Sequence, residues 1–257
     1  MPQESNGIMY TRRRLLGLVG VMSATATAGC MGDTDGDTGS DSEPPREDIT
    51  VTTSDGVEIA ASYYESGETT PPGVVLAHQL GGDRSQWGEL PTLVLEEGFD
   101  VISIDLRGHG ESDGDWQSFD ESDFGAMVKD VAAAESYLFE NGADDSRTGM
   151  AGASIGANAV LDYVSEGDPD AVLLLSPANS YRGIEVVEEA DNYDDPAFVG
   201  YFSEDRSEAA RSDARSLGES MGAEIHEYEG EGHGVDALDI EGVPQEYANW
   251  LSSSLND

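Results

Sequence analysis

Residues 148–164 read TGMAGASIGANAVLDYV and contain the pentapeptide Gly152-Ala153-Ser154-Ile155-Gly156, which fits the pattern G-x-S-x-G. Residues 148–151 predict a short strand, and residues 155–164 carry apolar side chains at helical spacing. Glycine on both sides of Ser154 permits a tight, strained turn from strand to helix, in which neighbouring backbones come close together. We therefore expect the hydroxyl of Ser154 to be exposed at the end of a strand, with the amide of Ile155 opening the helix.

The same alternation of strand and helix continues along the chain. Strands are predicted at residues 73–77, 101–106, 148–151, 171–175, 197–202 and 223–228, and helices at residues 85–97, 122–139, 155–164, 207–221 and 244–251. A continuous apolar run such as residues 172–175 is typical of a strand buried on both faces. Residues 49–53 and 57–64 alternate apolar and polar side chains around a turn, which predicts an antiparallel hairpin. The pattern predicts an α/β fold with a mostly parallel, twisted sheet of about eight strands and helices on both faces.

Ligands of such sheets bind beyond the carboxyl ends of the strands, so the loops there hold the candidate functional residues. Serine is a weak nucleophile and needs a base, and the chain has four histidines. His78 and His109 each follow a strand and precede Ser154, while His226 lies inside the last predicted strand. His233 lies just past that strand in a glycine-rich loop. His233 is therefore the preferred base.

A carboxylate must hold the other imidazole nitrogen and stabilise the imidazolium. The strand at residues 197–202 is followed by Glu204 and Asp205, at the edge where His233 is expected. Asp205 is preferred, and Glu204 remains the alternative. Because the surface is rich in acids, a solvated acidic turn without a function is the other interpretation of both residues.

The chain resembles the α/β-hydrolase superfamily, in particular its lidless dienelactone-hydrolase-like and carboxylesterase-like members. The resemblance covers nearly all of residues 49–257 and rests on four stretches: His78-Gln79-Leu80-Gly81-Gly82, Asp105-Leu106-Arg107-Gly108-His109-Gly110-Glu111-Ser112, the pentapeptide around Ser154, and Gly232-His233-Gly234. The order Ser154, Asp205, His233 along the chain is also the order of that superfamily.

The resemblance implies a serine hydrolase that cleaves small carboxylic esters through an acyl-enzyme, without a cofactor or a metal. His233 would take the proton of Ser154, and the backbone amides of Leu80 and Ile155 would bind the oxyanion. The resemblance assigns His109 a structural role in its loop. A peptidase or acyltransferase of the same fold is one alternative, and a non-catalytic binding lipoprotein is another.

The pocket is less well defined by the sequence. Residues 176–196, where helical lids of the superfamily usually enter, are too few for a large lid, so we expect an open site and small or soluble esters. Gln79 stands where the superfamily usually has glycine, and its amide is a candidate pocket group. Trp87, Trp116 and Tyr181 are further candidates, with packing in the core or at the rim as the alternative for each.

The chain is strongly acidic, with 53 Asp and Glu against 12 Lys and Arg and a formal net charge of −41. This balance argues against nucleic acid as a partner, because phosphate binding needs clustered cations. Lys129 is the sole lysine. A charge this large destabilises a compact state unless salt screens it, so the composition resembles that of halophilic archaeal proteins.

The N-terminal residues predict export. Residues 11–17 read TRRRLLG and precede a short apolar stretch, as in a twin-arginine signal. Residues 27–30, Thr-Ala-Gly-Cys, resemble a lipobox in which Cys30, the only cysteine, would be lipidated. A plain cleaved signal with a free cysteine is the alternative. The predicted organisation is a signal at residues 1–30, an acidic linker at 31–48 and a hydrolase domain at 49–257, anchored by lipid to the outer face of the cell membrane. Oligomeric state stays open.

Overall fold

The computed structural model describes residues 46–256. A sheet of eight strands has the order β1-β2-β4-β3-β5-β6-β9-β10. Its strands are β1 (Arg46–Thr52), β2 (Glu58–Tyr64), β3 (Gly73–Ala77), β4 (Asp100–Ile104), β5 (Thr148–Ala153), β6 (Ala171–Leu175), β9 (Ala197–Phe202) and β10 (Glu224–Tyr228). β2 pairs antiparallel with β1 and β4, and all the other pairs are parallel. The predicted α/β sheet with an N-terminal hairpin is confirmed.

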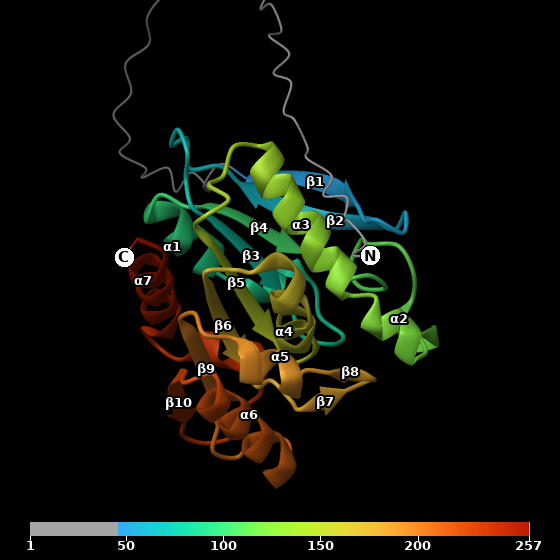
Figure 1. Ribbon diagram of the computed structural model, residues 1–257, viewed down its shortest axis with the longest axis vertical. Coiled ribbons are helices and arrows are strands. Elements are labelled where there is room, and N and C mark those ends of the chain that lie inside the picture. Colours follow the sequence, from blue (N-terminus) through green and yellow to red (C-terminus); the bar gives the residue numbers. More distant parts are fainter. Residues whose placement is uncertain (1–45, 257) are drawn as a thin grey trace, which may run out of the picture. The chain divides into compact units, whose positions relative to one another are not determined.

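Helices cover both faces of the sheet. They are α1 (Leu90–Glu96), α2 (Glu121–Gly125), α3 (Val128–Glu140), α4 (Ile155–Gly167), α5 (Val187–Asn192), α6 (Glu208–Ser220) and α7 (Val243–Asn256). Buried side chains of α3, α4, α5 and α6 share one apolar cluster with the sheet, and those of α1 and α7 share the other. Figure 1 shows α3 and α4 in front of the sheet and α1 beside α7.

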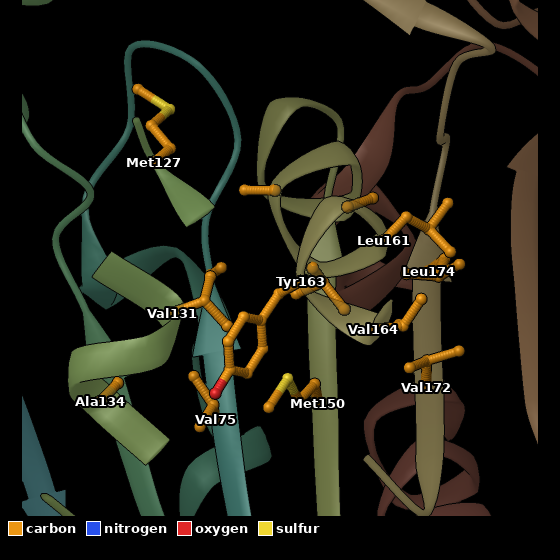
Figure 2. Packing of buried hydrophobic residues seen from close by; sticks show 14 of the residues in the cluster. Val75, Met127, Val131, Ala134, Met150, Leu161, Tyr163, Val164, Val172 and Leu174 are labelled. Carbon is orange, nitrogen blue, oxygen red and sulfur yellow. The ribbon is translucent and has the colours of Figure 1, made fainter. Parts of the chain in front are cut away.

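Strand β3 illustrates why the central strands are apolar throughout. All five of its residues are buried, with Val74 in the cluster of α1 and α7 and Val75 in the cluster of α3 and α4. Figure 2 shows Val75 and Met150 of the sheet close to Tyr163 of α4. Burying one such aliphatic side chain contributes about 1.5–3 kcal/mol. This packing fixes the position of α4, and so of the turn at which it begins.

Two predicted helices are divided in the structure. The helix expected at residues 85–97 is a 3-10 turn at Arg84–Trp87 followed by α1, because Gly88 between them has a φ of 56° that a right-handed helix does not allow. The helix expected at residues 122–139 is α2 and α3, with α2 ending at Gly125, and glycine weakens helices.

Residues 176–196 contain three short elements that the sequence did not predict. β7 (Ser180–Tyr181) and β8 (Ile184–Glu185) form a two-stranded hairpin, and α5 follows. Arg182 and Gly183 in the hairpin turn have φ values of 54° and 87°. Positive φ at both central residues is the requirement of a type I′ turn, which matches the twist of a hairpin. Strands of two residues are too short to leave a periodic pattern in the sequence.

The N-terminal boundary of the domain differs from the expected one. β1 begins at Arg46, so residues 46–48 of the expected linker belong to the sheet. Their backbone pairs with β2, and Asp48 also accepts a hydrogen bond from Ser62 Oγ at 2.8 Å, which lets polar residues extend the strand. The expected signal and Cys30 lie outside the described residues. No helix within residues 46–256 combines the length and apolar character that crossing a membrane requires.

Candidate active site

The turn between β5 and α4 holds Ser154 in a strained backbone conformation, with a φ of 53°. Both neighbouring glycines are needed there. A Cβ on Gly152 would lie 2.5 Å from the carbonyl oxygen of Gly156, and a Cβ on Gly156 would lie 2.2 Å from that of Ala77. The second approach brings the loop after β3 against the first turn of α4. The expected position of Ser154 at the end of a strand agrees with the structure, but the residue is buried rather than exposed.

The side chain of Ser154 joins a chain of hydrogen bonds. Its hydroxyl is 2.8 Å from Nε2 of His233, and Nδ1 of His233 is 2.6 Å from Oδ1 of Asp205. All three residues are buried, whereas Glu204 is exposed. Since the carboxylate can only accept, His233 carries its proton on Nδ1 and leaves the Nε2 lone pair for the hydroxyl proton. The structure therefore brings the predicted serine, histidine and aspartate together and leaves Glu204 out.

Ser176, which the sequence analysis did not single out, supports the carboxylate. Its hydroxyl donates to Oδ2 of Asp205 at 2.6 Å and accepts from the backbone N–H of Gly234 at 3.0 Å. Ser176 directly follows β6 and has a φ of 50°, a strained value like that of Ser154. Its place after a buried strand, at the edge that carries Ser154, was a usable sequence signal.

The expected oxyanion donors are free in the structure. The carbonyl oxygen of Gln79 accepts from Nδ1–H of His78 at 2.8 Å and from N–H of Gly82 at 3.1 Å. In a trans peptide the C=O and N–H groups point in opposite directions, so these bonds turn the N–H of Leu80 away from them. Neither Leu80 nor Ile155 donates its backbone N–H to an acceptor within residues 46–256.

Two other histidines hold the loops around the site. His78 is fully buried, and its Nε2 accepts from the backbone N–H of Leu106 at 3.0 Å. Burial lowers the pKa of His78 to about 4, so its ring is neutral near pH 7. His109 donates from Nδ1 to the carbonyl oxygen of Arg107 and stacks on Trp116, with ring centroids 5.6 Å apart. Burial also lowers the pKa of His109.

His226 lies on β10, where its ring stacks on Tyr228 at 4.4 Å between centroids and its Nδ1 is 3.5 Å from a carboxylate oxygen of Glu246. The expectation that His226 is a strand residue rather than the base agrees with these contacts.

The four candidate pocket residues differ in their burial and in their contacts. Trp87 does not line an open site, since it is fully buried with α1 and α7, at the end of a 3-10 turn that packs over the sheet. Trp116 is half-buried against His109. Tyr181 is half-buried in β7, with the guanidinium carbon of Arg182 5.8 Å from its ring centroid. Gln79 reaches toward the loop after His233 instead of standing free, since its Oε1 accepts a backbone N–H there.

The arrangement provides a nucleophile, a base, an acid that orients the base, and two free backbone donors. These are the groups that attack on an acyl carbon requires. Within residues 46–256, no group of three or more His, Cys, Asp or Glu side chains is arranged to hold a metal ion.

Comparisons with known proteins find similarity to hydrolases. A family model described as serine aminopeptidase, S33, matches residues 72–189, which include Ser154. The chain is 34% identical over 130 residues to a bifunctional esterase/perhydrolase of Acinetobacter calcoaceticus, covering 50% of this chain and 44% of the relative. It is 34% identical over 123 residues to a non-heme chloroperoxidase of Streptomyces lividans, covering 48% and 41%. The chain thus spans less than half the length of either relative.

Among solved structures, an esterase of Pyrococcus furiosus is similar, with a TM-score of 0.65 and 19% identity over 86% of this chain and 95% of that one. The sheet order, the strand–serine–helix turn and the structural match show that the chain has the fold of α/β-hydrolases. The predicted α/β-hydrolase fold is confirmed, while membership of the superfamily and of its dienelactone-hydrolase-like part stays a prediction.

Proposed function

We propose that the protein is a serine hydrolase that cleaves small carboxylic esters. The observation that carries the proposal is the hydrogen-bonded chain from Ser154 through His233 to Asp205, with distances of 2.8 and 2.6 Å. The similarity to a bifunctional esterase/perhydrolase supports hydrolysis of esters.

In the proposed reaction, His233 Nε2 takes the hydroxyl proton while Ser154 Oγ forms a bond to the acyl carbon. The resulting oxyanion accepts hydrogen bonds from the amides of Leu80 and Ile155, and Asp205 stabilises the imidazolium. His233 then gives the proton to the alkoxy oxygen, the alcohol leaves, and water releases the acyl group by the same steps. Loss of one oxyanion donor raises such a barrier by about 3–4 kcal/mol.

Small substrates are favoured by the segment between β6 and β9. That segment contains the β7–β8 hairpin and α5, a helix of six residues, where a large helical lid would need a longer insertion. We propose short acyl and alcohol groups on this basis.

A peptidase is the second candidate, favoured by the family model described as serine aminopeptidase that spans residues 72–189. The proposed chemistry at Ser154 is the same for an amide as for an ester. Rates on a matched panel of esters and peptide amides separate the two, since a peptidase cleaves the peptide amides and an esterase leaves them intact.

The experiment for the reaction class is fluorophosphonate labelling of the folded protein in molar salt, with Ser154→Ala beside it. We expect one adduct on Ser154, and a loss of ester turnover of at least about 10⁴-fold in the variant with its fold intact. Ser212→Ala, at an exposed position, is the matched control and should keep both properties. Wild-type protein that is not labelled would refute the proposal and favour the non-catalytic binding lipoprotein. Turnover that survives in Ser154→Ala would refute the role of Ser154 as the nucleophile.

Export and lipid attachment at Cys30 are a separate proposal, supported by the arginines and the Thr-Ala-Gly-Cys run of residues 11–30. Detergent phase partition of the full chain tests it. The wild type should enter the detergent phase and Cys30→Ser the aqueous phase, and identical partition would contradict lipidation.

A further inference from the structure

The side chain of Gln79 connects two loops of the site. Its Oε1 accepts the backbone N–H of Val235 at 3.3 Å, two residues after His233. Its own carbonyl oxygen is held by His78 and Gly82, in the peptide that carries the N–H of Leu80. One residue therefore links the peptide of an expected oxyanion donor to the loop of the expected base.

The two loops approach closely at Gly234, where a larger residue would displace the side chain of Gln79. Gly234 has a φ of 57°, and a Cβ built on it would lie 2.3 Å from Gln79 Oε1. The orientation of the carboxamide is assigned by its partner, because the atom facing the N–H of Val235 must be the oxygen. The Nε2 group of Gln79 donates to no group within residues 46–256, so the contact with Val235 is the one that holds this side chain.

The other hydrogen bonds from the loop after β10 to the rest of the site reach the loops after β5, β6 and β9, and none reaches the loop after β3. His233 is held by Asp205 through its ring and by the Asp236 carboxylate, which accepts the backbone N–H of His233 at 2.9 Å. Gly234 is held by Ser176. Gln79 alone among these contacts ties the base to the loop of Leu80.

We propose that Gln79 is a positioning residue that fixes the position of the Leu80 N–H relative to the imidazole of His233, so that both groups act on the same reaction centre. This inference rests on the proposed hydrolase function. The oxyanion donor and the base act on the same tetrahedral intermediate, so an error in their relative position weakens both contributions. A misplacement of about 1 Å can lower a rate about 100-fold, so loss of a single bridging bond is expected to lower kcat about tenfold.

The test compares Gln79→Leu and Gln79→Asn with the wild type. Leucine removes the acceptor at similar volume, and asparagine keeps the carboxamide but is one methylene too short to reach Val235. We expect both to lower kcat on a small ester about tenfold, with KM within about twofold and an unchanged melting temperature. Inhibition by a trifluoromethyl ketone, which forms a tetrahedral adduct with serine, should weaken in proportion to kcat/KM. Gln117→Leu, at an exposed position, is the control and should match the wild type.

Two results would overturn the inference: a kcat within twofold of wild type in either folded variant, or a raised KM at unchanged kcat, which would make Gln79 a substrate contact. If a Gln79 variant is too unstable to assay, Gly234→Ala tests the contact between Gln79 and Val235 by a substitution in the loop after β10. Its methyl group displaces the carboxamide, and kcat should again fall with little change in KM. If a fluorophosphonate does not label the wild-type protein, the proposed hydrolase function is wrong. If the wild type is labelled and the Gln79 variants keep its kcat, only the positioning role of Gln79 is wrong.

Discussion

Four non-glycine residues within 46–256 have positive φ values: Ser154, Asp168, Ser176 and Arg182. Asp168 ends α4 and Arg182 lies in a hairpin turn, positions where positive φ is common. The two serines follow the neighbouring strands β5 and β6 and bond to His233 and Asp205 respectively. Such backbone strain costs about 1–3 kcal/mol per residue and persists only where the surrounding structure imposes it. The strain at these serines therefore belongs to the site.

His78 gives a pH-dependent contribution to stability. Burial lowers its pKa to about 4 from an ordinary value of 6.5. Between these values the unfolded chain binds a proton at His78 and the folded protein does not, so acidification favours unfolding. From pH 7.5 to pH 5 the free energy of unfolding should lose about 2 kcal/mol through this residue. Urea unfolding at the two pH values measures it.

The control for this measurement is His78→Gln, whose side chain does not titrate. Burial raises the pKa of Asp130 to about 6, a shift that favours the folded state on acidification and would mask His78 in the wild type alone. Both proteins contain Asp130, so its contribution cancels when the pH dependence of the free energy of unfolding of the variant is subtracted from that of the wild type. An equal pH dependence in both proteins would show that His78 does not carry the effect.

Sequence patterns identified Ser154, Asp205 and His233 because each lies at a strand end within a local motif. Ser176 and the contact from Gln79 to Val235 have no such motif. They depend on the distance between loops that follow different strands, which the strand order and the packing of α4 determine. The sequence left Trp87 open between a pocket and the core for a related reason, since only the packing of its turn shows that it is buried.

At the scale of elements, α4 must approach the end of β3 closely. A Cβ on Gly156 would lie 2.2 Å from the oxygen of Ala77 and 2.5 Å from that of His78, and backbone atoms cannot move aside cheaply. Gly156→Ala should therefore destabilise the protein by about 3 kcal/mol and displace the turn of Ser154. Urea unfolding and ester turnover measure the two effects.

Gly125, at the end of α2, is the matched control because a Cβ there meets nothing within 4 Å and its φ is not positive. Gly125→Ala should leave turnover unchanged and stabilise the protein by about 0.5–1 kcal/mol, through lower entropy of the unfolded chain. Equal stability of Gly156→Ala and Gly125→Ala would contradict the conclusion that α4 lies too close to β3 for a Cβ at residue 156.

The strands could be predicted almost to the residue where apolar runs are continuous: β3, β6 and β9 agree with the sequence analysis at both ends. Helix boundaries were less accurate, because the break at Gly88 depends on its backbone conformation, which helical spacing of apolar residues does not reveal. The β7–β8 hairpin depends on a turn at Arg182 and Gly183, where only the glycine signals positive φ.

In the whole chain the 12 Lys and Arg are too few to neutralise the 53 Asp and Glu, and within residues 46–256 two arginines each contact more than one carboxylate. Arg84 contacts Asp105 and Glu111 and lies 3.7 Å from Asp48. Arg107 pairs with Asp55 and Asp130 at 3.0 and 2.8 Å. These pairs connect the β1–β2 hairpin to the loop after β4. Most of the other carboxylates within residues 46–256 have no cation to offset their mutual repulsion. The net charge of −41 therefore has to be screened by solvent ions.

Salt should consequently stabilise the fold strongly. The Debye length falls from about 10 Å at 0.1 M to about 3 Å at 1 M salt, so repulsion between exposed carboxylates is largely removed. We expect the melting temperature to rise by about 10 °C or more between 0.1 and 2 M KCl, which for a domain of this size corresponds to about 3–5 kcal/mol.

A variant that lacks one surface charge distinguishes the screening of charge repulsion from the general effect of salt on protein hydration. Burial and, to a smaller extent, the nearby charges of Glu189 and Glu166 together raise the pKa of Asp162 to about 6, so like charges crowd this part of α4 and α5. Glu189→Gln removes one of them and should stabilise the protein at 0.1 M KCl by a few tenths of a kcal/mol, on the order of 0.5. That gain should vanish in 2 M KCl, where repulsion is already screened. A gain of the same size at both concentrations, or a wild-type melting temperature that ignores KCl, would mean that self-repulsion is not what limits stability in this acidic chain.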